Sequence, residues 1–159
     1  MNKSLGKDLV NRKFTIPVVP RTKKNSQQVF VRNGRIINIP SKLYQQFEKE
    51  GLKVIHEKYR KKIDYPVNIK AVFYVETRRR IDLTNLLEAL DDMLVKAEVI
   101  LDDNRDIVAS HNGSVVYWDK ENPRIEVEIT EVKNYERWKA NEKSKIKTNS
   151  RISRRNIKK

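Results

Sequence analysis

The residues best suited to chemistry are aspartates at the two ends of one short segment. Asp82 precedes a run of regularly spaced leucines, and the pair Asp102-Asp103 follows about twenty residues later. Carboxylate oxygens are the ligands that Mg²⁺ prefers, and this ion commonly takes one or two of them together with water and substrate phosphate. A metal held in this way activates water and stabilises the leaving oxygen in phosphodiester hydrolysis. If the chain folds back so that the two ends meet, Asp82 and Asp103 can share one cation.

Each of these acids also has a simpler structural interpretation. Asp82 stands where a helix is expected to begin, and an aspartate at that position commonly caps free backbone N–H groups. The sequence Asp102-Asp103-Asn104 has the composition of an ordinary turn. Within the helix, Asp91 and Asp92 are expected on the solvent side, where Asp92 and Lys96 are spaced for an ion pair one turn apart. The spacing of the acids by itself is therefore a weak signal.

The acidic segment stands out because the rest of the protein is basic. The 159 residues carry a formal charge of +14, whereas residues 82–106 contain eight acids against two bases, a net charge of −6. An excess of lysine and arginine favours a polyanionic partner, because neutralised phosphates release condensed counterions. Carboxylates repel such a partner unless they hold a cation. The contrast favours a metal site, although a count of acids does not exclude an amphipathic helix with an acidic outer face.

Composition restricts the remaining classes of protein. Cysteine is absent, so neither disulfides nor a thiolate metal site can form. No apolar run approaches the roughly 18 residues of a membrane span, and residues 1–13 lack the apolar stretch of a secretory signal. Four glycines and no glycine-rich phosphate loop disfavour nucleotide-binding folds. A cytoplasmic protein with no membrane association is the simplest expectation.

The strands that would support the acidic segment are visible as apolar patterns. Residues 14–20 predict a short β segment, and residues 29–39 predict a hairpin, because Asn33-Gly34 supplies the positive φ values of a tight turn. Clean alternation predicts strands over 66–75 and 124–132, and a further strand lies within 107–118, around or beyond a turn.

Two helices are expected to cover this sheet. Ser41 is a suitable N-cap for the first, whose apolar positions are Leu43, Phe47, Leu52, Ile55 and Tyr59. The second helix begins after Asp82, carries a leucine stripe and ends near Ala97 or Glu98. The fold class is therefore α/β in the α+β sense: one mixed domain over residues 1–132, with a small mixed or antiparallel sheet. Residues 133–159, with eleven bases and two acids, form a basic tail that is helical or disordered, and that either binds DNA or only aids solubility.

The stretch RRIDLTNLLEALDDMLVKAEVILDDNRDIV resembles the signature of the RusA family of Holliday-junction resolvases. That signature reads D-x-D-N-L-x-K, then D-x-L, then a spacer and D-D before a strand. The positions that match it without a gap are Asp82, Asn85, Leu86, Asp92, Leu94, Asp102 and Asp103. The resemblance is strong over about thirty residues. It extends more weakly to Lys24-Asn25-Ser26 and to the final strand, and does not include the tail.

The resemblance implies a homodimeric endodeoxyribonuclease that depends on Mg²⁺, with Mn²⁺ as an alternative. Such enzymes act in recombination and repair, cut four-way DNA junctions by paired nicks, and are often encoded by phages or prophages. On this interpretation Asp82 and Asp103 are metal ligands, and Asp102 is a neighbour that ligates or supports them. The basic residues expected to bind DNA are Lys23, Lys24, Arg78, Arg79 and Arg80.

Two positions depart from the family pattern. Thr84 stands where the family has its second aspartate, and Glu88 stands where it has a lysine. Glu88 lies one helical turn after Thr84 and on the same face. We therefore expect Glu88 to restore the missing carboxylate as a metal ligand and catalytic residue, with the lost positive charge supplied by Lys24 or by Arg78, Arg79 or Arg80.

Three functions follow from these observations. The first is a structure-selective DNA endonuclease. The second is a junction- or duplex-binding protein that kept the fold and lost cleavage, as Thr84 and Glu88 suggest. The third is a basic RNA-binding protein, which explains the charge but not the acidic segment. His56 and His111 lack partners at metal-ligand spacing and are expected at the surface or in hydrogen bonds, and Trp118 is expected to pack in the core or a dimer rather than to stack on bases.

Overall fold

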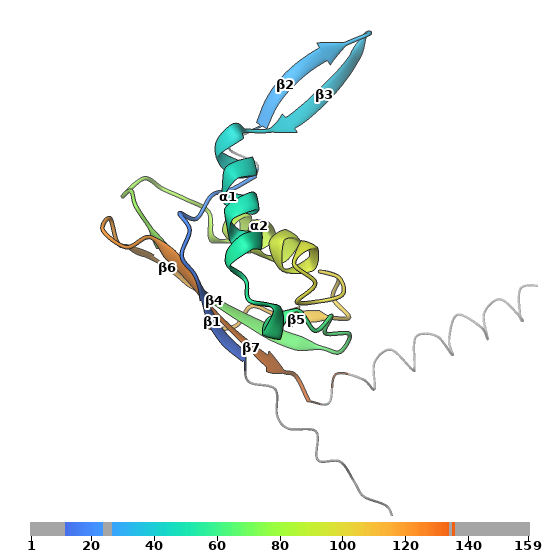
Figure 1. Cartoon of the computed structure of the whole chain (residues 1–159), viewed down its shortest axis with the longest axis vertical. Helices are drawn as coiled ribbons and strands as arrows, with labels where there is room; N and C mark the ends of the chain where they lie inside the picture. The colour runs from blue at the N-terminus through green and yellow to red at the C-terminus, as the bar shows by residue number, and fades with distance from the viewer. Residues whose placement is uncertain (1–11, 24–26, 134, 136–159) are drawn as a thin grey trace, which may run out of the picture.

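A five-stranded mixed sheet forms the centre of the protein, and two helices cover one of its faces (Figure 1). The computed structural model describes residues 12–23, 27–133 and 135. Three antiparallel strands lie in the order β1 (Arg12–Ile16), β7 (Arg124–Glu131) and β4 (Val67–Val75). Along the other edge of β4, β5 (Val108–Ser110) and β6 (Val115–Trp118) both pair with it in parallel. The predicted α+β domain is thus confirmed.

Strict alternation along β4 and β7 creates the face that packs against the helices. Every second residue of β4, from Val67 to Val75, is buried, and β7 buries Ile125, Val127 and Ile129 in the same way. Successive side chains of a strand point to opposite faces, so the residues between them form the other face of the sheet. The alternation predicted from sequence for both strands is confirmed.

The first helix, α1 (Lys42–Val54), is followed by the short 3₁₀ helix η2 (Glu57–Tyr59). Ser41 is its N-cap as expected, because the amide of Tyr44 donates to Ser41 Oγ at 3.2 Å. The apolar stripe was predicted wrongly at its start. Leu43 is 58% exposed and Tyr44 enters the core instead, because the first turn of α1 lies beside the hairpin rather than over the sheet (Figure 1). Phe47 is buried as predicted.

The second helix, α2 (Leu83–Lys96), follows the leucine stripe closely. Its buried side includes Leu86, Leu90 and Leu94, none of which is more than 1% exposed. Ala97 is the C-cap residue, so the helix ends where the sequence predicted. Glu98 then takes a left-handed conformation with φ of 57°, which turns the chain back toward the sheet. The backbone of Ile63 bridges Ile100 on this return path.

The hairpin forms a separate two-stranded sheet that extends away from the rest of the protein beyond the start of α1 (Figure 1). Its strands are β2 (Gln27–Arg32) and β3 (Arg35–Pro40). The turn residues Asn33 and Gly34 have φ of 53° and 72°, as the sequence predicted. No described helix is long and apolar enough to cross a membrane.

The remaining expectations concern Trp118, Lys24 and the basic tail. Trp118 is not a core residue: it lies at the last position of β6 and is 49% exposed, because the edge strand β6 ends there and no described helix covers it. Lys24 and most of the predicted tail, residues 134 and 136–159, lie outside the described residues.

Candidate metal and nucleic-acid site

Asp82 is held at the start of α2 by the loop that follows β4. It occupies the N-cap position, as expected, but its carboxylate makes no capping hydrogen bond. Instead, the side-chain amide of Asn85 donates to Asp82 Oδ2 at 3.1 Å. Asp82 is exposed, so its carboxylate is oriented by Asn85 and remains accessible to a ligand.

At the other end of the segment, Asp102 organises a turn. Its Oδ1 accepts the backbone amide of Asp103 at 2.8 Å, and its Oδ2 accepts the side-chain amide of Asn104 at 2.7 Å. These hydrogen bonds, with that from Asn104 first, lower the pKa of Asp102. In contrast, partial burial raises the pKa of Asp103, with further contributions from Asp102 and from the negative charge of Asp92. The predicted turn is confirmed, and it presents two aspartates with opposite pKa shifts.

The return of the chain brings Asp103 to the second half of α2. The charge of Asp92 acts on Asp103, and the charge of Asp103 in turn raises the pKa of Asp91. Asp103 therefore lies close enough to the acids of α2 for their charges to interact.

Mg²⁺ is the ion that the family pattern implies for this segment. Among the described residues, no three acidic or histidine side chains are grouped to hold a metal ion. Mg²⁺ often uses only one or two protein carboxylates and completes its octahedral shell with water and substrate phosphates. Carboxylates such as those of Asp82 and Asp103 fit that requirement in their chemistry, provided that most of the shell comes from outside the described residues.

The predicted position of Asp91 on the solvent side of α2 is wrong. Asp91 is 7% exposed, and its Oδ2 lies 2.9 Å from His111 Nε2. His111 Nδ1 lies 3.0 Å from the carbonyl oxygen of Ile69, and because a carbonyl can only accept, Nδ1 carries a proton. The segment after β5 therefore covers this side of the helix, which no spacing within the helix could reveal. The hydrogen-bonded role expected for His111 is confirmed.

One proton is shared within this pair. Burial raises the pKa of Asp91, and the hydrogen bond to Asp91 raises the pKa of His111. The Oδ1 atom of Asp91 is buried and has no hydrogen-bond partner among the described residues. The pair thus joins α2 to β4 and to the loop before β6 through a buried polar contact.

Asp92 does not pair with Lys96, contrary to the prediction. Lys96 forms an ion pair with Glu48 of α1, and Lys23 Nζ lies 2.9 Å from Asp92 Oδ2. The hydrogen bond and charge of Asp92, followed by the charges of Glu88 and Glu48, raise the pKa of Lys23. Glu48 of α1 reaches Lys96 and Lys23 of the loop after β1 reaches Asp92, so the pairing within the helix is replaced.

Lys23 thereby reaches the helix face that carries both departures from the family pattern. Thr84, Glu88 and Asp92 are spaced by four residues and share one side of α2. Sequence reasoning placed Lys23 among the DNA-binding residues but did not place it beside Glu88. The contact spans 69 positions of sequence, and no local pattern signals it.

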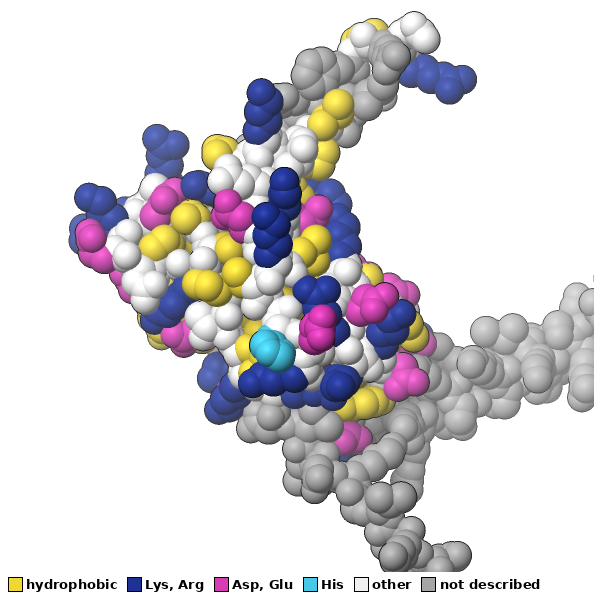
Figure 2. Space-filling view, in the orientation of Figure 1, with side chains coloured by type: hydrophobic (Ala, Val, Ile, Leu, Met, Phe, Trp, Pro, Cys, Tyr) yellow, Lys and Arg dark blue, Asp and Glu magenta, His cyan; other side chains and the backbone are white. Residues whose placement is uncertain are grey.

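The arginines lie in the loop between β4 and α2. Arg78, Arg79 and Arg80 are all exposed. A pocket of about 310 Å³ is lined by Arg79 and Arg80 together with Arg21, and extends to Ile81, next to Asp82. Arg21 is partly neutralised by Glu76 at 2.7 Å. Figure 2 shows Lys and Arg side chains at the left end of the molecule, where this loop lies in Figure 1. A basic pocket of this kind suits a phosphate and lies directly beside the start of α2.

The family assignment rests on the whole domain rather than on the motif alone. The sequence model of the family Endodeoxyribonuclease RusA matches residues 17–130. The chain belongs to the RusA endodeoxyribonuclease family. This match includes both ends of the acidic segment, the arginine loop and Lys23. A search of curated proteins finds no match to the sequence.

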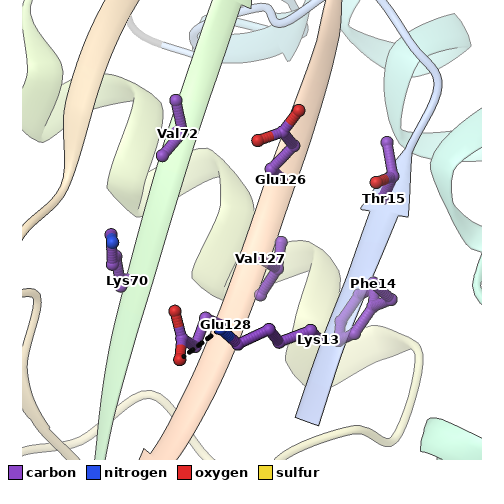
Figure 3. Close-up of a pocket in the computed structure, with 8 residues that line it drawn as sticks. All are labelled: Lys13, Phe14, Thr15, Lys70, Val72, Glu126, Val127 and Glu128. Atoms are coloured by element: carbon purple, nitrogen blue, oxygen red, sulfur yellow. Dashed lines mark ion pairs between the residues drawn. The ribbon is translucent and has the colours of Figure 1, made fainter.

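The opposite face of this RusA-family domain has a different charge. Figure 3 views the sheet from the side without helices, where Lys13, Lys70, Glu126 and Glu128 line a pocket of about 260 Å³. Lys13 pairs with Glu128 at 3.1 Å. Two lysines are thus balanced by two glutamates, so this pocket lacks the excess positive charge that phosphate binding requires. The face that carries α2 and the arginine loop is the better candidate for DNA.

Proposed function

We propose that this RusA-family protein is a divalent-metal-dependent endonuclease that resolves four-way DNA junctions by paired nicks. The observation that carries the proposal is the family match over residues 17–130, a range that contains both Asp82 and Asp103. The exposed carboxylate of Asp82, the arginine-lined pocket next to it and the charge of +14 support the same conclusion. The reaction would take place in the cytoplasm during DNA recombination or repair.

The acids of the segment are proposed to hold the metal. Asp82 and Asp103 are the ligands at the two family positions, and Glu88 supplies the carboxylate that Thr84 lacks. Asp102 supports Asp103, because it accepts the backbone amide of that residue. When Mg²⁺ or Mn²⁺ is bound, it supplies an activated water and stabilises charge on the leaving oxygen.

The basic residues are proposed to position the DNA. Arg79 and Arg80 line the pocket beside Asp82 and would hold a phosphate close to the reacting bond. Glu88 stands where the family has a lysine, and Lys23 offers a positive charge on the same helix face. Lys23 therefore replaces the charge of the family's lysine, a role first expected of Lys24 or of an arginine in the loop after β4. Two symmetric nicks need two sites, which a homodimer would provide.

The test is cleavage of a synthetic four-way junction with Mg²⁺, with Mn²⁺ and with EDTA. The parent protein should nick the junction only when a divalent metal is present, and Asp103→Asn should abolish cleavage while leaving junction binding intact. Asp64→Asn is the matched control, because Asp64 is an exposed aspartate outside the segment. Cleavage in EDTA, or full activity of Asp103→Asn, would contradict the proposal.

The second candidate function is a junction-binding protein without cleavage. Thr84 and Glu88 favour it, because a hydroxyl and a glutamate replace the aspartate and lysine of the family pattern. Metal-independent binding of the junction with no nicking would establish this function. Preferential binding of RNA would instead establish a basic RNA-binding protein. Equal cleavage by Glu88→Gln and the parent would show that Glu88 does not replace the missing carboxylate.

A further inference from the structure

Two exposed aromatic residues end strand β6 and point to opposite faces of the sheet. Tyr117 is 52% exposed and Trp118 is 49% exposed. Neighbouring residues of a strand alternate between the faces, and Tyr117 pairs with Tyr74 while Trp118 pairs with Val75. Two large aromatic side chains exposed to this extent at one strand end need an explanation. The neighbours of Tyr117 differ from those of Trp118.

The ring of Tyr117 belongs to a closed cluster. Its centroid lies 5.8 Å from that of Tyr74, and the guanidinium of Arg124 lies 3.6 Å from the centroid of Tyr74. Arg124 Nη1 pairs with Asp119 at 3.0 Å and Arg124 Nε pairs with Glu126 at 2.9 Å. The charge of Arg124 is therefore already balanced by two acids, and the cluster does not favour an additional anion.

Trp118 has the opposite arrangement. The guanidinium of Arg78 lies 4.1 Å from the centroid of the Trp118 ring. Among the described residues, no acidic side chain forms an ion pair with Arg78. Stacking on the indole uses the flat face of the guanidinium and leaves its N–H groups directed outward, where they can bind a phosphate. Half of the Trp118 surface remains exposed beside this cation.

The pair also lies at the same end of the sheet as Asp82. The amide of Asp119 donates to the carbonyl of Val75 at 3.0 Å, which ties the end of β6 to the end of β4. Val75 is buried on the helix-covered face, and it lines the arginine pocket. In Figure 1 the loops after β4 and β6 lie side by side at the left. Trp118 therefore lies on the face and at the end where the candidate site begins.

We propose that Trp118 and Arg78 form a binding site for one unpaired DNA base and its phosphate. The base stacks on the exposed indole, and Arg78 binds the phosphate. Within a duplex the faces of a base are covered by its neighbours, so a stacking site selects DNA with unstacked bases, as at a branch point or in a single strand. The inference rests on the proposed function for its substrate and adds the group that distinguishes branched DNA from linear duplex.

The test is binding measured by fluorescence anisotropy in EDTA, so that cleavage plays no part. Three labelled DNAs are compared: a four-way junction, an oligo(dT) strand and a linear duplex. Stacking of a base is worth about 1–3 kcal/mol, so Trp118→Ala should weaken binding of the junction and of oligo(dT) by about 5- to 150-fold. Binding of the duplex should change less than about 2-fold, because phosphate contacts dominate there.

Matched variants separate stacking from a general loss of structure. Tyr117→Ala removes an equally exposed aromatic from the adjacent position and should leave binding of all three DNAs unchanged. Trp118→Phe should restore most of the affinity, because an aromatic ring is retained. The protein contains two tryptophans, so in a Trp138→Phe background the fluorescence reports Trp118 alone, and oligo(dT) should quench it.

The outcomes distinguish this inference from the proposed function. If the parent binds all three DNAs but Trp118→Ala binds them equally well, the stacking site is overturned while the proposed function stands. An equal loss for the duplex, an equal loss in Tyr117→Ala, or unquenched Trp118 fluorescence would overturn it as well. If the parent binds none of the three DNAs, both are overturned.

Discussion

Replacing His111 with leucine should destabilise the fold strongly, because it removes the partner of a buried carboxylate. Asp91 is 7% exposed, its Oδ2 contacts only His111 among the hydrogen bonds that the structure describes, and its Oδ1 has no partner among the described residues. Without the imidazole, the folded protein must hold either an unpaired buried charge or a protonated acid at neutral pH.

The size of the effect follows from the position of the pair. Removing one partner of a buried ion pair typically costs about 3–5 kcal/mol. The side chains of His111 and Asp91 are 24% and 11% exposed, so water reaches one edge of the pair. The lower end, about 3 kcal/mol, is therefore expected for His111→Leu. The double variant Asp91→Leu/His111→Leu should recover most of this loss, since paired apolar replacements are often neutral or stabilising.

The assay is urea unfolding followed by circular dichroism at several pH values. The pKa of His111 is raised in the folded protein by its bond to Asp91. Its contribution to stability is therefore complete below the unfolded pKa of about 6.5 and is lost as the pH rises through the folded value. The pKa of Asp91 is also raised, by burial, and its contribution likewise falls with rising pH, starting from the unfolded pKa of about 3.9. The double variant should lack this decline above pH 6.5.

His56 provides the control, because it is exposed and accepts only the local amide of Lys58 at 3.1 Å. His56→Leu should cost less than about 1 kcal/mol. The reasoning would be refuted if His111→Leu also lost less than about 1 kcal/mol, or if the double variant were no more stable than His111→Leu alone.

Four further variants test single features of the fold by the same unfolding assay. Ser41→Ala should cost about 1 kcal/mol of stability, because it removes the N-cap hydrogen bond from the amide of Tyr44. Asp82→Asn should change stability by less than about 0.5 kcal/mol, because the Asp82 side chain makes no capping hydrogen bond. Equal losses for the two variants would contradict this. Gly51→Ala should destabilise the protein by about 1 kcal/mol, because the added methyl group would meet the buried sulfur of Met93. This loss is expected despite the better helix propensity of alanine. A gain in stability would show that Met93 moves aside easily. Arg60→Ala should cost about 1–2 kcal/mol, because the guanidinium binds two carbonyls near the end of α1, the shorter bond being 2.6 Å; no loss would show that water replaces it.

Several parts of the fold could be predicted because they depend on local geometry. The alternation of β4 and the leucine stripe of α2 follow from the periods of a strand and a helix with one buried side. The Asn33-Gly34 turn and the Ser41 cap follow from backbone conformation and from a single nearby amide. These features depend on residues within a few positions of one another, and the structure agrees with each of them.

The partners of the acids could not be predicted because they depend on where the chain returns. The residues that bind Asp91, Asp92 and Lys96 are 20, 69 and 48 positions away. For Asp92 and Lys96, the neighbour one helical turn away was the only candidate visible in the sequence, and for Asp91 the sequence offered no partner. Helix spacing offers a weak surface ion pair of a few tenths of a kcal/mol, and the folded structure replaces it with contacts to other elements.

The sequence by itself determined the class of fold, the elements, the family pattern and the excess of positive charge, because periodicity, capping and composition act locally or additively along the chain. Only the tertiary structure decided that Asp91 is buried against His111, that Lys23 reaches the side of α2 that carries Glu88, and that Trp118 is exposed beside Arg78. These arrangements depend on β5 and β6 pairing with one edge of β4 and on α1 crossing α2. Contacts between distant segments follow from how whole elements pack, and no spacing within one element encodes them.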